Sequence, residues 1–118
     1  MPINSKQKGA AFERTVALMF RENGIINAHR TAQFSGKTGQ AADVEGIPLV
    51  HVEAKAQEKM RLYDWMNQSI RDSEAEGKGN LPIVVHKANR KDVLVTMRFD
   101  DWMKLYKIYL DYNITEVQ

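Results

Sequence analysis

The stretch Leu49–Ala56 constrains the fold more than any other part of the sequence, because apolar and polar residues alternate along it. One set of positions holds Val50, Val52 and Ala54, and the other holds His51, Glu53 and Lys55. This period of two predicts a β-strand with an apolar face on one side and a polar face on the other. The chain must therefore build a sheet and cover its apolar side with other elements.

Other parts of the chain have periods typical of helices or of further strands. Phe12, Val16, Met19 and Phe20 recur three and four residues apart and predict a first helix that ends at Gly24. The predicted elements are helices over 8–23, 61–76 and 101–110, strands over 27–34, 49–56, 83–86 and 93–99, and an extended segment over 41–45. This order predicts a single α/β or α+β sheet with helices packed on it, and frayed ends at about 1–5 and 113–118.

The length of 118 residues fits one domain, and we expect the whole chain, 1–118, to form it. The absence of cysteine excludes disulfides, thiolate zinc sites and cysteine nucleophiles. The first residues contain no apolar leader segment, and no apolar run approaches the ~18 residues of a membrane span. We therefore expect a cytoplasmic location and no membrane partner.

Charge is distributed unevenly along the chain, although its sum is only +2. Residues 1–37 and 78–91 each carry a net charge of +4, whereas residues 38–58 carry −3. This pattern is typical of a surface that brings phosphates to an acidic metal site. Ordinary solvated charges give the same pattern, so the charge distribution alone leaves both interpretations open.

The tripeptide Glu53-Ala54-Lys55 is the central chemical signal, because residues two apart on a strand point to the same face. Asp43 precedes it on a segment that could pair with this strand, and Glu13 could reach the same place from the first helix. Converging carboxylates form an oxygen-ligand site for Mg²⁺ or Mn²⁺, which polarises a phosphoryl oxygen and lowers the pKa of bound water. The alternatives are an exposed Glu/Lys pair on an edge strand and, for Glu13, a surface helix position.

Several other residues have both a functional and a structural interpretation. The stretch 30–37, with Arg30, Ser35 and Lys37, either follows a phosphate backbone or is a flexible connection, and it lacks the spacing of a nucleotide P-loop. His51 shares a face with Glu53 and could line the edge of the site. Four aromatic residues are expected in the core or an interface rather than as platforms for stacked bases: Trp65, Trp102, Tyr106 and Tyr109.

Together these residues resemble the PD-(D/E)XK, restriction-endonuclease-like nuclease superfamily, and within it archaeal and phage Holliday-junction resolvases and related small phage endonucleases. The resemblance runs from about Asn4 to Tyr106, and its motifs occur in the family's order. They are Lys8–Arg14, Arg30 with Gln33–Gly36, Asp43-Val44, His51–Lys55, a following helix with Gln68, Pro82–His86, and Asn89–Met97. Ala42 replaces the proline that usually precedes the aspartate, a residue that shapes the backbone rather than binding metal.

The resemblance implies a fold and a role for each matching residue. The fold is a restriction-endonuclease-like α/β fold, a mixed central sheet of about five strands flanked by helices. The implied catalytic residues are Glu13, Asp43, Glu53 and Lys55, of which Glu13, Asp43 and Glu53 bind Mg²⁺ or, in its place, Mn²⁺. The implied DNA contacts are Lys8, Arg30, Ser35, Lys37 and Arg90, and the implied supporting residue is Gln68.

We therefore expect a Mg²⁺-dependent endodeoxyribonuclease, a phage-type Holliday-junction resolvase that cuts four-way junctions by phosphodiester hydrolysis during DNA recombination. Because the family's resolvases are homodimers that nick opposed strands, the resemblance also implies a homodimer bound to branched double-stranded DNA. One alternative is a less selective phage endonuclease for packaging or DNA degradation. The other is a DNA-binding module that retains the fold without the chemistry.

Overall fold

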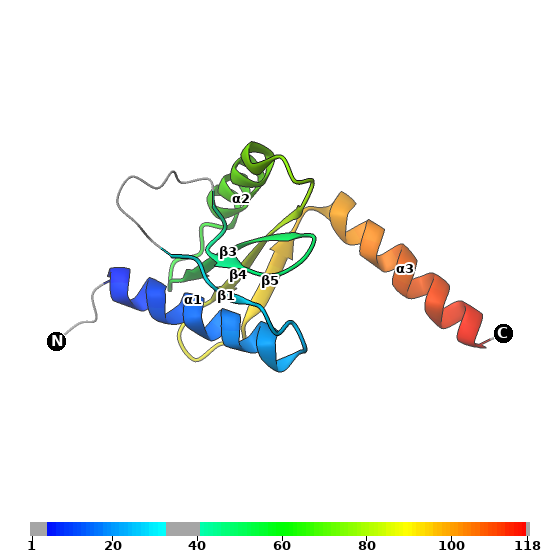
Figure 1. Ribbon diagram of the computed structural model, residues 1–118, viewed down its shortest axis with the longest axis horizontal. Helices are drawn as coiled ribbons and strands as arrows, with labels where there is room; N and C mark the ends of the chain where they lie inside the picture. Colours follow the sequence, from blue (N-terminus) through cyan, green and yellow to red (C-terminus); the bar gives the residue numbers. More distant parts are fainter. Residues whose placement is uncertain (1–4, 33–40, 118) are drawn as a thin grey trace.

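A computed structural model describes residues 5–32 and 41–117, which form an α/β arrangement (Figure 1). The elements in chain order are α1 (Ser5–Glu22), β1 (His29–Arg30), β2 (Val44–Glu45), β3 (Val50–Ala56), α2 (Leu62–Glu76), β4 (Leu81–Lys87), β5 (Leu94–Met97) and α3 (Phe99–Val117). The sheet lies between α1 and α2, and α3 extends away from this layered body. The predicted fold class is therefore confirmed.

The five strands form one mixed sheet in the order β1-β2-β3-β4-β5. β3 and β4 are parallel, and every other neighbouring pair is antiparallel. Parallel neighbours need a long crossover connection, which α2 provides between β3 and β4. β3 is thus the middle strand, with Val52 paired to Val44 on one side and to Ile83 on the other.

The two faces of the sheet are packed differently. The face under α1 is apolar, and its buried cluster consists of Phe12, Val16, Ala17, Val44, Val52, Ala54, Ile83 and Val85. The face under α2 has a smaller apolar cluster of Trp65, Met66 and Val84, with Leu62 and Ile70 beside it. The alternation predicted for β3 is confirmed, but its polar residues His51 and Glu53 are each only 1% exposed. The alternative of an exposed pair on an edge strand is therefore wrong for Glu53.

Gly77 ends α2 where the sequence predicts a stop. Its φ of 69° lies in the left-handed region, and its N–H donates to the carbonyl oxygens of Ser73 and Glu74. Glycine adopts this conformation without the strain that a side chain would introduce. The chain then enters β4, so α2 stays above β3 and β4.

Several predicted boundaries are wrong. The described part of the predicted strand 27–34 is extended only at His29–Arg30, and the strand predicted over 93–99 ends at Met97 because Phe99 already begins α3. The last helix continues to Val117, so residues 113–117 belong to a helix rather than to a frayed end. Residues 99–117 contain no glycine or proline that would stop the helix.

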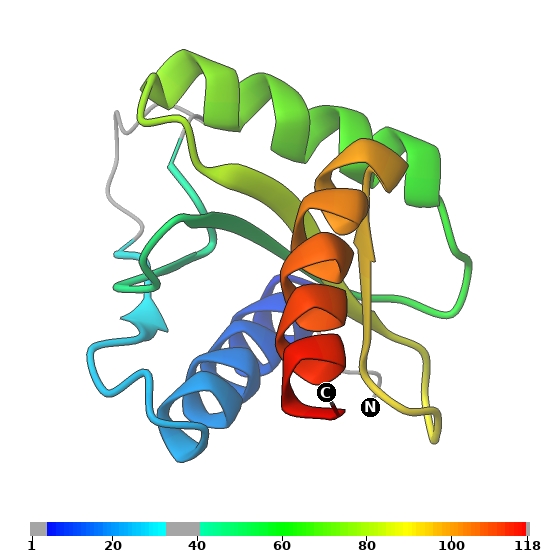
Figure 2. The ribbon, with the colours of Figure 1, turned by 90° about the vertical axis from the view of Figure 1, so that its right-hand side faces the viewer.

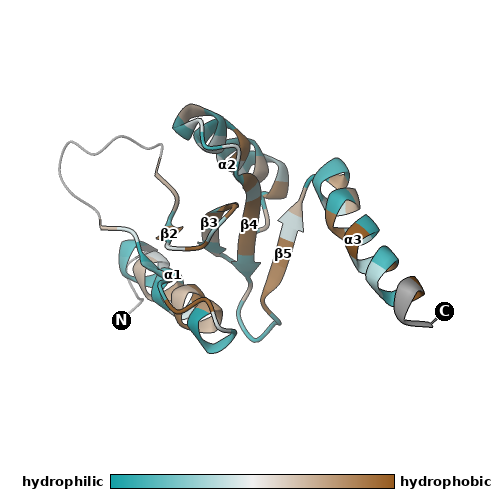
Figure 3. Cartoon of the chain, turned by 45° about the vertical axis from the view of Figure 1, so that its right-hand side comes forward, coloured by the Kyte–Doolittle hydropathy of each residue, from teal (hydrophilic) through white to brown (hydrophobic). Residues whose placement is uncertain are grey.

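The extension of α3 gives the molecule its long axis, with extents of 58 × 34 × 29 Å. Figure 2 views the molecule from the side on which α3 lies and shows the sheet and α1 behind this helix. Figure 3 shows apolar residues, in brown, along the strands and again on α3. Among the described residues, no helix has the length and apolarity needed to span a bilayer.

Candidate active site

Asp43 stands directly before β2 and is fixed by three hydrogen bonds to backbone groups. Its carbonyl oxygen accepts from Thr31 N and its own N–H donates to Val52 O, each at 2.9 Å. The N–H of Ala54 donates to Asp43 Oδ2 at 2.9 Å. The carboxyl group is therefore held against β3, beside Glu53.

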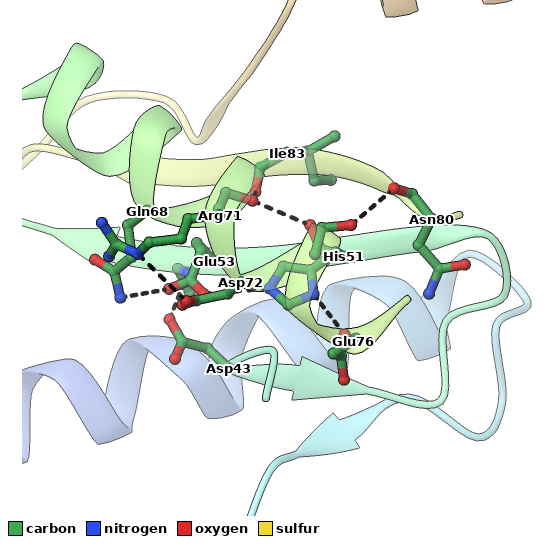
Figure 4. A network of polar contacts seen from close by, with 12 residues as sticks. Asp43, His51, Glu53, Gln68, Arg71, Asp72, Glu76, Asn80 and Ile83 are labelled. Carbon is green, nitrogen blue, oxygen red and sulfur yellow. Dashed lines mark hydrogen bonds and ion pairs between the residues drawn. The ribbon is translucent and has the colours of Figure 1, made fainter. Parts of the chain in front are cut away.

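Glu53 lies in the middle of β3, under α2, and its side chain is almost completely buried. Gln68 Nε2 on α2 donates to Glu53 Oε2 at 3.4 Å, and His51 Nε2 lies 3.4 Å from Glu53 Oε1 (Figure 4). Both carboxylate oxygens thus have a polar neighbour. The structure brings Gln68 to Glu53, as a supporting residue would require.

The carboxyl group of Glu53 lies close enough to Asp43 to change the charge state of Asp43. Burial raises the pKa of Asp43 from its ordinary value of 3.8 to about 7, and the negative charge of Glu53 adds to this effect. The N–H of Ala54 and the charge of Lys55 act in the opposite direction but do not outweigh it. Asp43 therefore keeps its proton to a higher pH than an ordinary aspartate does.

Glu13 reaches the same place from α1 and is paired with Arg30 of β1. Arg30 Nε donates to Glu13 Oε1 at 2.7 Å, and the two side chains are 28% and 14% exposed. Burial raises the pKa of Glu13, although Arg30 pulls it down, and the charges of Asp43 and Lys55 also act on it. The structure therefore places Arg30 against the acidic site. Its predicted contact with DNA stays a prediction.

A cleft of about 610 Å³ opens between the start of α1 and the end of β3. It is lined by Lys8, Gly9, Glu13, Asp43, Ala54, Lys55, Ala56, Gln57, Glu58 and Lys59. Three of the four predicted catalytic residues, Glu13, Asp43 and Lys55, line this cleft directly. Glu53 does not line it and lies beside Asp43, under α2. Lys8, predicted to contact DNA, is part of the wall.

The remaining predicted DNA contacts lie elsewhere. Arg90 is exposed in the turn between β4 and β5. This turn touches the rim of the cleft, because the N–H of Asn89 donates to Glu58 Oε2 at 2.6 Å. Ser35 and Lys37 lie outside the described residues, so their placement as DNA contacts stays a prediction.

His51 was expected at the edge of the site and lies beside Glu53, but its buried polar network with residues of α2 was not predicted. His51 Nδ1 lies 2.7 Å from Glu76 Oε1, and the side chains of His51, Glu53 and Asp72 each offer an atom within 4.8 Å of the others (Figure 4). Asp72 and Glu76 come from α2, where Gln68, Asp72 and Glu76 follow one another at intervals of four residues. The sequence therefore does contain a signal for this network, because a polar stripe on a helix is expected to face a polar strand.

The charge state of His51 follows from this network. Burial on its own lowers the pKa of His51, but its hydrogen bonds to Glu53 and Glu76 outweigh burial and raise it. In its protonated form the ring donates to both carboxylates. His51 therefore links Glu53 to Glu76, and with Glu53 and Asp72 it forms a candidate metal-binding group.

A mixed sheet between two helices, with Asp43 beside Glu53-Ala54-Lys55 on the middle strand, is the arrangement of the PD-(D/E)XK nuclease superfamily. The family model described as "Phage putative PDDEXK endonuclease" matches residues 4–118, and the chain belongs to this family. The resemblance inferred from the sequence motifs is therefore confirmed. No curated protein matches the chain significantly.

A solved structure with a similar fold is that of Hjc from Archaeoglobus fulgidus, described as a Holliday junction resolvase from an archaeal hyperthermophile. The match has a TM-score of 0.55 and 23% sequence identity, and it covers 76% of this chain and 72% of the archaeal one. This likeness shows a common restriction-endonuclease-like fold.

Proposed function

We propose that this protein is a divalent-metal-dependent endodeoxyribonuclease that hydrolyses phosphodiester bonds in branched DNA, with the four-way junction as its preferred substrate. The convergence of Glu13, Asp43 and Lys55 on one cleft, with Glu53 beside Asp43, carries this proposal. Membership of a phage endonuclease family supports the reaction type. The fold shared with an archaeal Holliday junction resolvase supports the junction as substrate.

The donor set fits Mg²⁺. Asp43 and Glu53 would hold the ion and Glu13 would complete its acidic side, because hard cations prefer carboxylate oxygens. The raised pKa of Asp43 supports this assignment, because a cation beside the two carboxyl groups would favour their charged forms. When bound, the ion would polarise a phosphoryl oxygen and offset the charge that develops during hydrolysis. Mn²⁺ prefers similar ligands and would substitute.

The other residues of the cleft would act on the scissile phosphate. Lys55 is on the cleft wall beside Asp43, where its ammonium group would stabilise negative charge on the phosphate or orient the attacking water. Arg30 would keep Glu13 in position through their 2.7 Å hydrogen bond. Lys8 in the wall and Arg90 near the rim would attract the DNA backbone, and Ser35 and Lys37 are proposed to contact it too.

A four-way junction has to be nicked in two strands for symmetric resolution, and each chain contributes one such cleft. We therefore propose a homodimer with two clefts, acting in recombination of DNA in the cytoplasm of an infected bacterial cell.

Cleavage of labelled four-way, flapped and linear duplex DNA with Mg²⁺ tests the proposal. We expect symmetric nicks in the four-way junction, and we expect Asp43→Asn and Glu53→Gln to reduce the cleavage rate by about 100-fold or more while DNA is still bound. Glu45→Gln is the matched control, because Glu45 lies on β2 and pairs with His29 outside the cleft. This control should cut like the wild type.

Three results would contradict parts of the proposal. Equal cutting of linear duplex and junction would indicate a less selective phage endonuclease. Binding of junctions without cleavage in either Mg²⁺ or Mn²⁺ would indicate a DNA-binding module. Full activity of Asp43→Asn or Glu53→Gln would show that the reaction takes place elsewhere.

A further inference from the structure

α3 has an apolar face that nothing in the described part of the chain covers. The face consists of Phe99, Trp102, Tyr106, Tyr109 and Leu110, which lie on one side of the helix because they recur three, four and seven residues apart. All five are exposed, Phe99 by 70% and Tyr109 by 67%. Figure 1 shows why: only the start of α3 lies near the body, and the rest of the helix extends away from it.

Three of the four aromatic side chains of this face lie against one another. The rings of Phe99 and Trp102 are 6.1 Å apart, and those of Trp102 and Tyr106 are stacked at 5.0 Å with an angle of 7° between their planes. Asn113, which lies on the same side, donates to the carbonyl of Tyr109 at 2.7 Å and so has a partner in its own helix. A rigid surface of this kind loses little conformational entropy when it is covered.

The charges of α3 lie away from the apolar face and exclude two kinds of occupant. The described charged residues are Asp100, Asp101, Lys104, Lys107 and Asp111, so acidic groups outnumber basic ones. DNA would need cations on the face itself. A helix that binds an anionic membrane surface is rich in Lys and Arg on its polar side, which this helix is not.

A second copy of the chain fits the same face. Since the face has no charged residue among the described side chains, two copies can meet without repulsion, and a two-fold axis would place the same face of each copy against the other. With the neighbouring Leu105 and Tyr112, side chains of this size and exposure offer on the order of 700 Å² per copy, close to the ~800 Å² per partner of a stable interface.

We propose that α3 is the dimerisation helix of this protein, and that the face of Phe99, Trp102, Tyr106, Tyr109 and Leu110 packs against the same face of a second copy. The proposal specifies the surface of the homodimer that the proposed function includes. It depends on the exposed side chains of α3 and not on nuclease activity. It also agrees with the sequence-based expectation that Trp102, Tyr106 and Tyr109 belong to a core or an interface.

Two neighbouring positions of α3 provide a matched pair of variants. Tyr109 is 67% exposed and belongs to the face, whereas Ile108 is 68% exposed and lies on the other side of the helix. Tyr109→Glu and Ile108→Glu therefore introduce the same charge at equal exposure into the same helical turn. Circular dichroism checks that both variants retain the helix content of the wild type.

Sedimentation velocity and light scattering between about 1 and 100 μM, without DNA or metal, measure the oligomeric state. We expect the wild type and Ile108→Glu to have twice the mass of the 13.5 kDa chain, and Tyr109→Glu to dissociate at least about 10-fold more readily. A wild type that stays monomeric at 100 μM, or two variants that dissociate equally, would overturn the proposal. A monomer that floats with phosphatidylglycerol vesicles would also overturn it, in favour of a membrane surface.

These measurements are independent of cleavage. A dimeric protein that cuts no DNA would contradict the proposed function and leave the interface intact. A monomeric protein that nicks junctions would contradict the interface and leave the chemistry intact.

Discussion

The two faces of β3 show how this small fold separates stability from chemistry. On one side Val52 and Ala54 pack under α1 in a cluster made only of apolar residues. The residues that follow them, Glu53 and Lys55, point to the other side of the strand. Glu53 lies beneath α2, and Lys55 lines the cleft. The same strand therefore contributes to the core on one face and to the candidate site on the other.

The difference lies in what each face needs from its surroundings. Apolar side chains stabilise the folded state simply by being removed from water. Buried polar groups must find partners, and on the α2 side they do: Ser69 Oγ donates to Ile83 O at 3.0 Å and Ser73 Oγ to Asn80 O at 2.9 Å. We infer that changes on the α1 side act mainly on stability and that changes on the polar side act mainly on cleavage.

The largest effect is expected on the polar side, from Lys55→Met. Removing the ammonium group should lower the cleavage rate by about 100- to 10,000-fold, because charge on the scissile phosphate is no longer stabilised. Lys55 lines the cleft and is only partly buried, so the free energy of unfolding should change little. Single-turnover cleavage and urea unfolding measure the two quantities.

Lys59→Met is the control for Lys55→Met, because Lys59 lines the same cleft from beyond the end of β3. The cleavage rate of Lys59→Met should fall only a few-fold, because this variant attracts DNA less strongly. Equal losses in both variants would mean that the position on β3 has no special chemical role.

The next largest effect is a dependence of stability on pH that originates on the polar side. The pKa of Asp43 is about 7 in the folded state against an ordinary 3.8, so the folded protein keeps a proton that the unfolded chain releases. The resulting stabilisation is complete below about pH 4 and is lost as the pH rises to about 7, at up to about 1.4 kcal/mol per pH unit. Urea unfolding at pH 5, 6 and 7 in EDTA measures it.

Asp43→Asn isolates this contribution, because asparagine can still accept the hydrogen bond from Ala54 but does not titrate. The variant should lose less stability than the wild type between pH 5 and 7. Any contribution of His51 is common to both proteins and cancels in the comparison. Parallel pH profiles for the two proteins would show that Asp43 is ionised throughout this range.

A smaller effect is expected on the apolar side, from Val52→Ala. Val52 has no exposed surface, and removing two methyl groups from this cluster should lower the free energy of unfolding by about 2 kcal/mol. The folded fraction should cleave DNA at the wild-type rate. Val50→Ala, at a partly buried position of the same face, should cost less. A loss of rate in Val52→Ala without a loss of stability would contradict the division between the two faces.

The sequence alone predicts much of the difference between the two faces of β3, because this difference depends on local periodicity. The alternation along Leu49–Ala56 predicts both faces of β3, and the spacing of Glu53 and Lys55 follows from strand geometry alone. The sequence could not show that the polar face is buried. That depends on how α2 crosses the sheet after the parallel connection from β3 to β4.

Long-range contacts account for the rest of what the sequence left out. Arg30 and Glu13 are 17 residues apart, and only the position of β1 beside α1 brings them together. The length of α3 was underestimated because Asp111 and Asn113 interrupt its apolar pattern, although neither residue stops a helix. The exposure of the apolar face of α3 could not be predicted either, because a helix buried in a core and a helix in an interface have the same apolar pattern.

The smallest effect tests how far the chemical side of β3 extends under α2. Glu76→Ala removes the carboxylate 2.7 Å from His51 Nδ1, so the ring that contacts Glu53 is less firmly oriented. Groups that orient a candidate metal ligand contribute about 10-fold to activity, so we expect a rate loss of that size. Glu76→Gln should recover most of it, because the amide oxygen still accepts a hydrogen bond. Glu74→Ala, exposed on the same helix, should have no effect. If Glu76→Ala cuts junctions at the wild-type rate, the polar residues under α2 only satisfy one another, and the chemistry of this face is confined to Glu53 and Lys55.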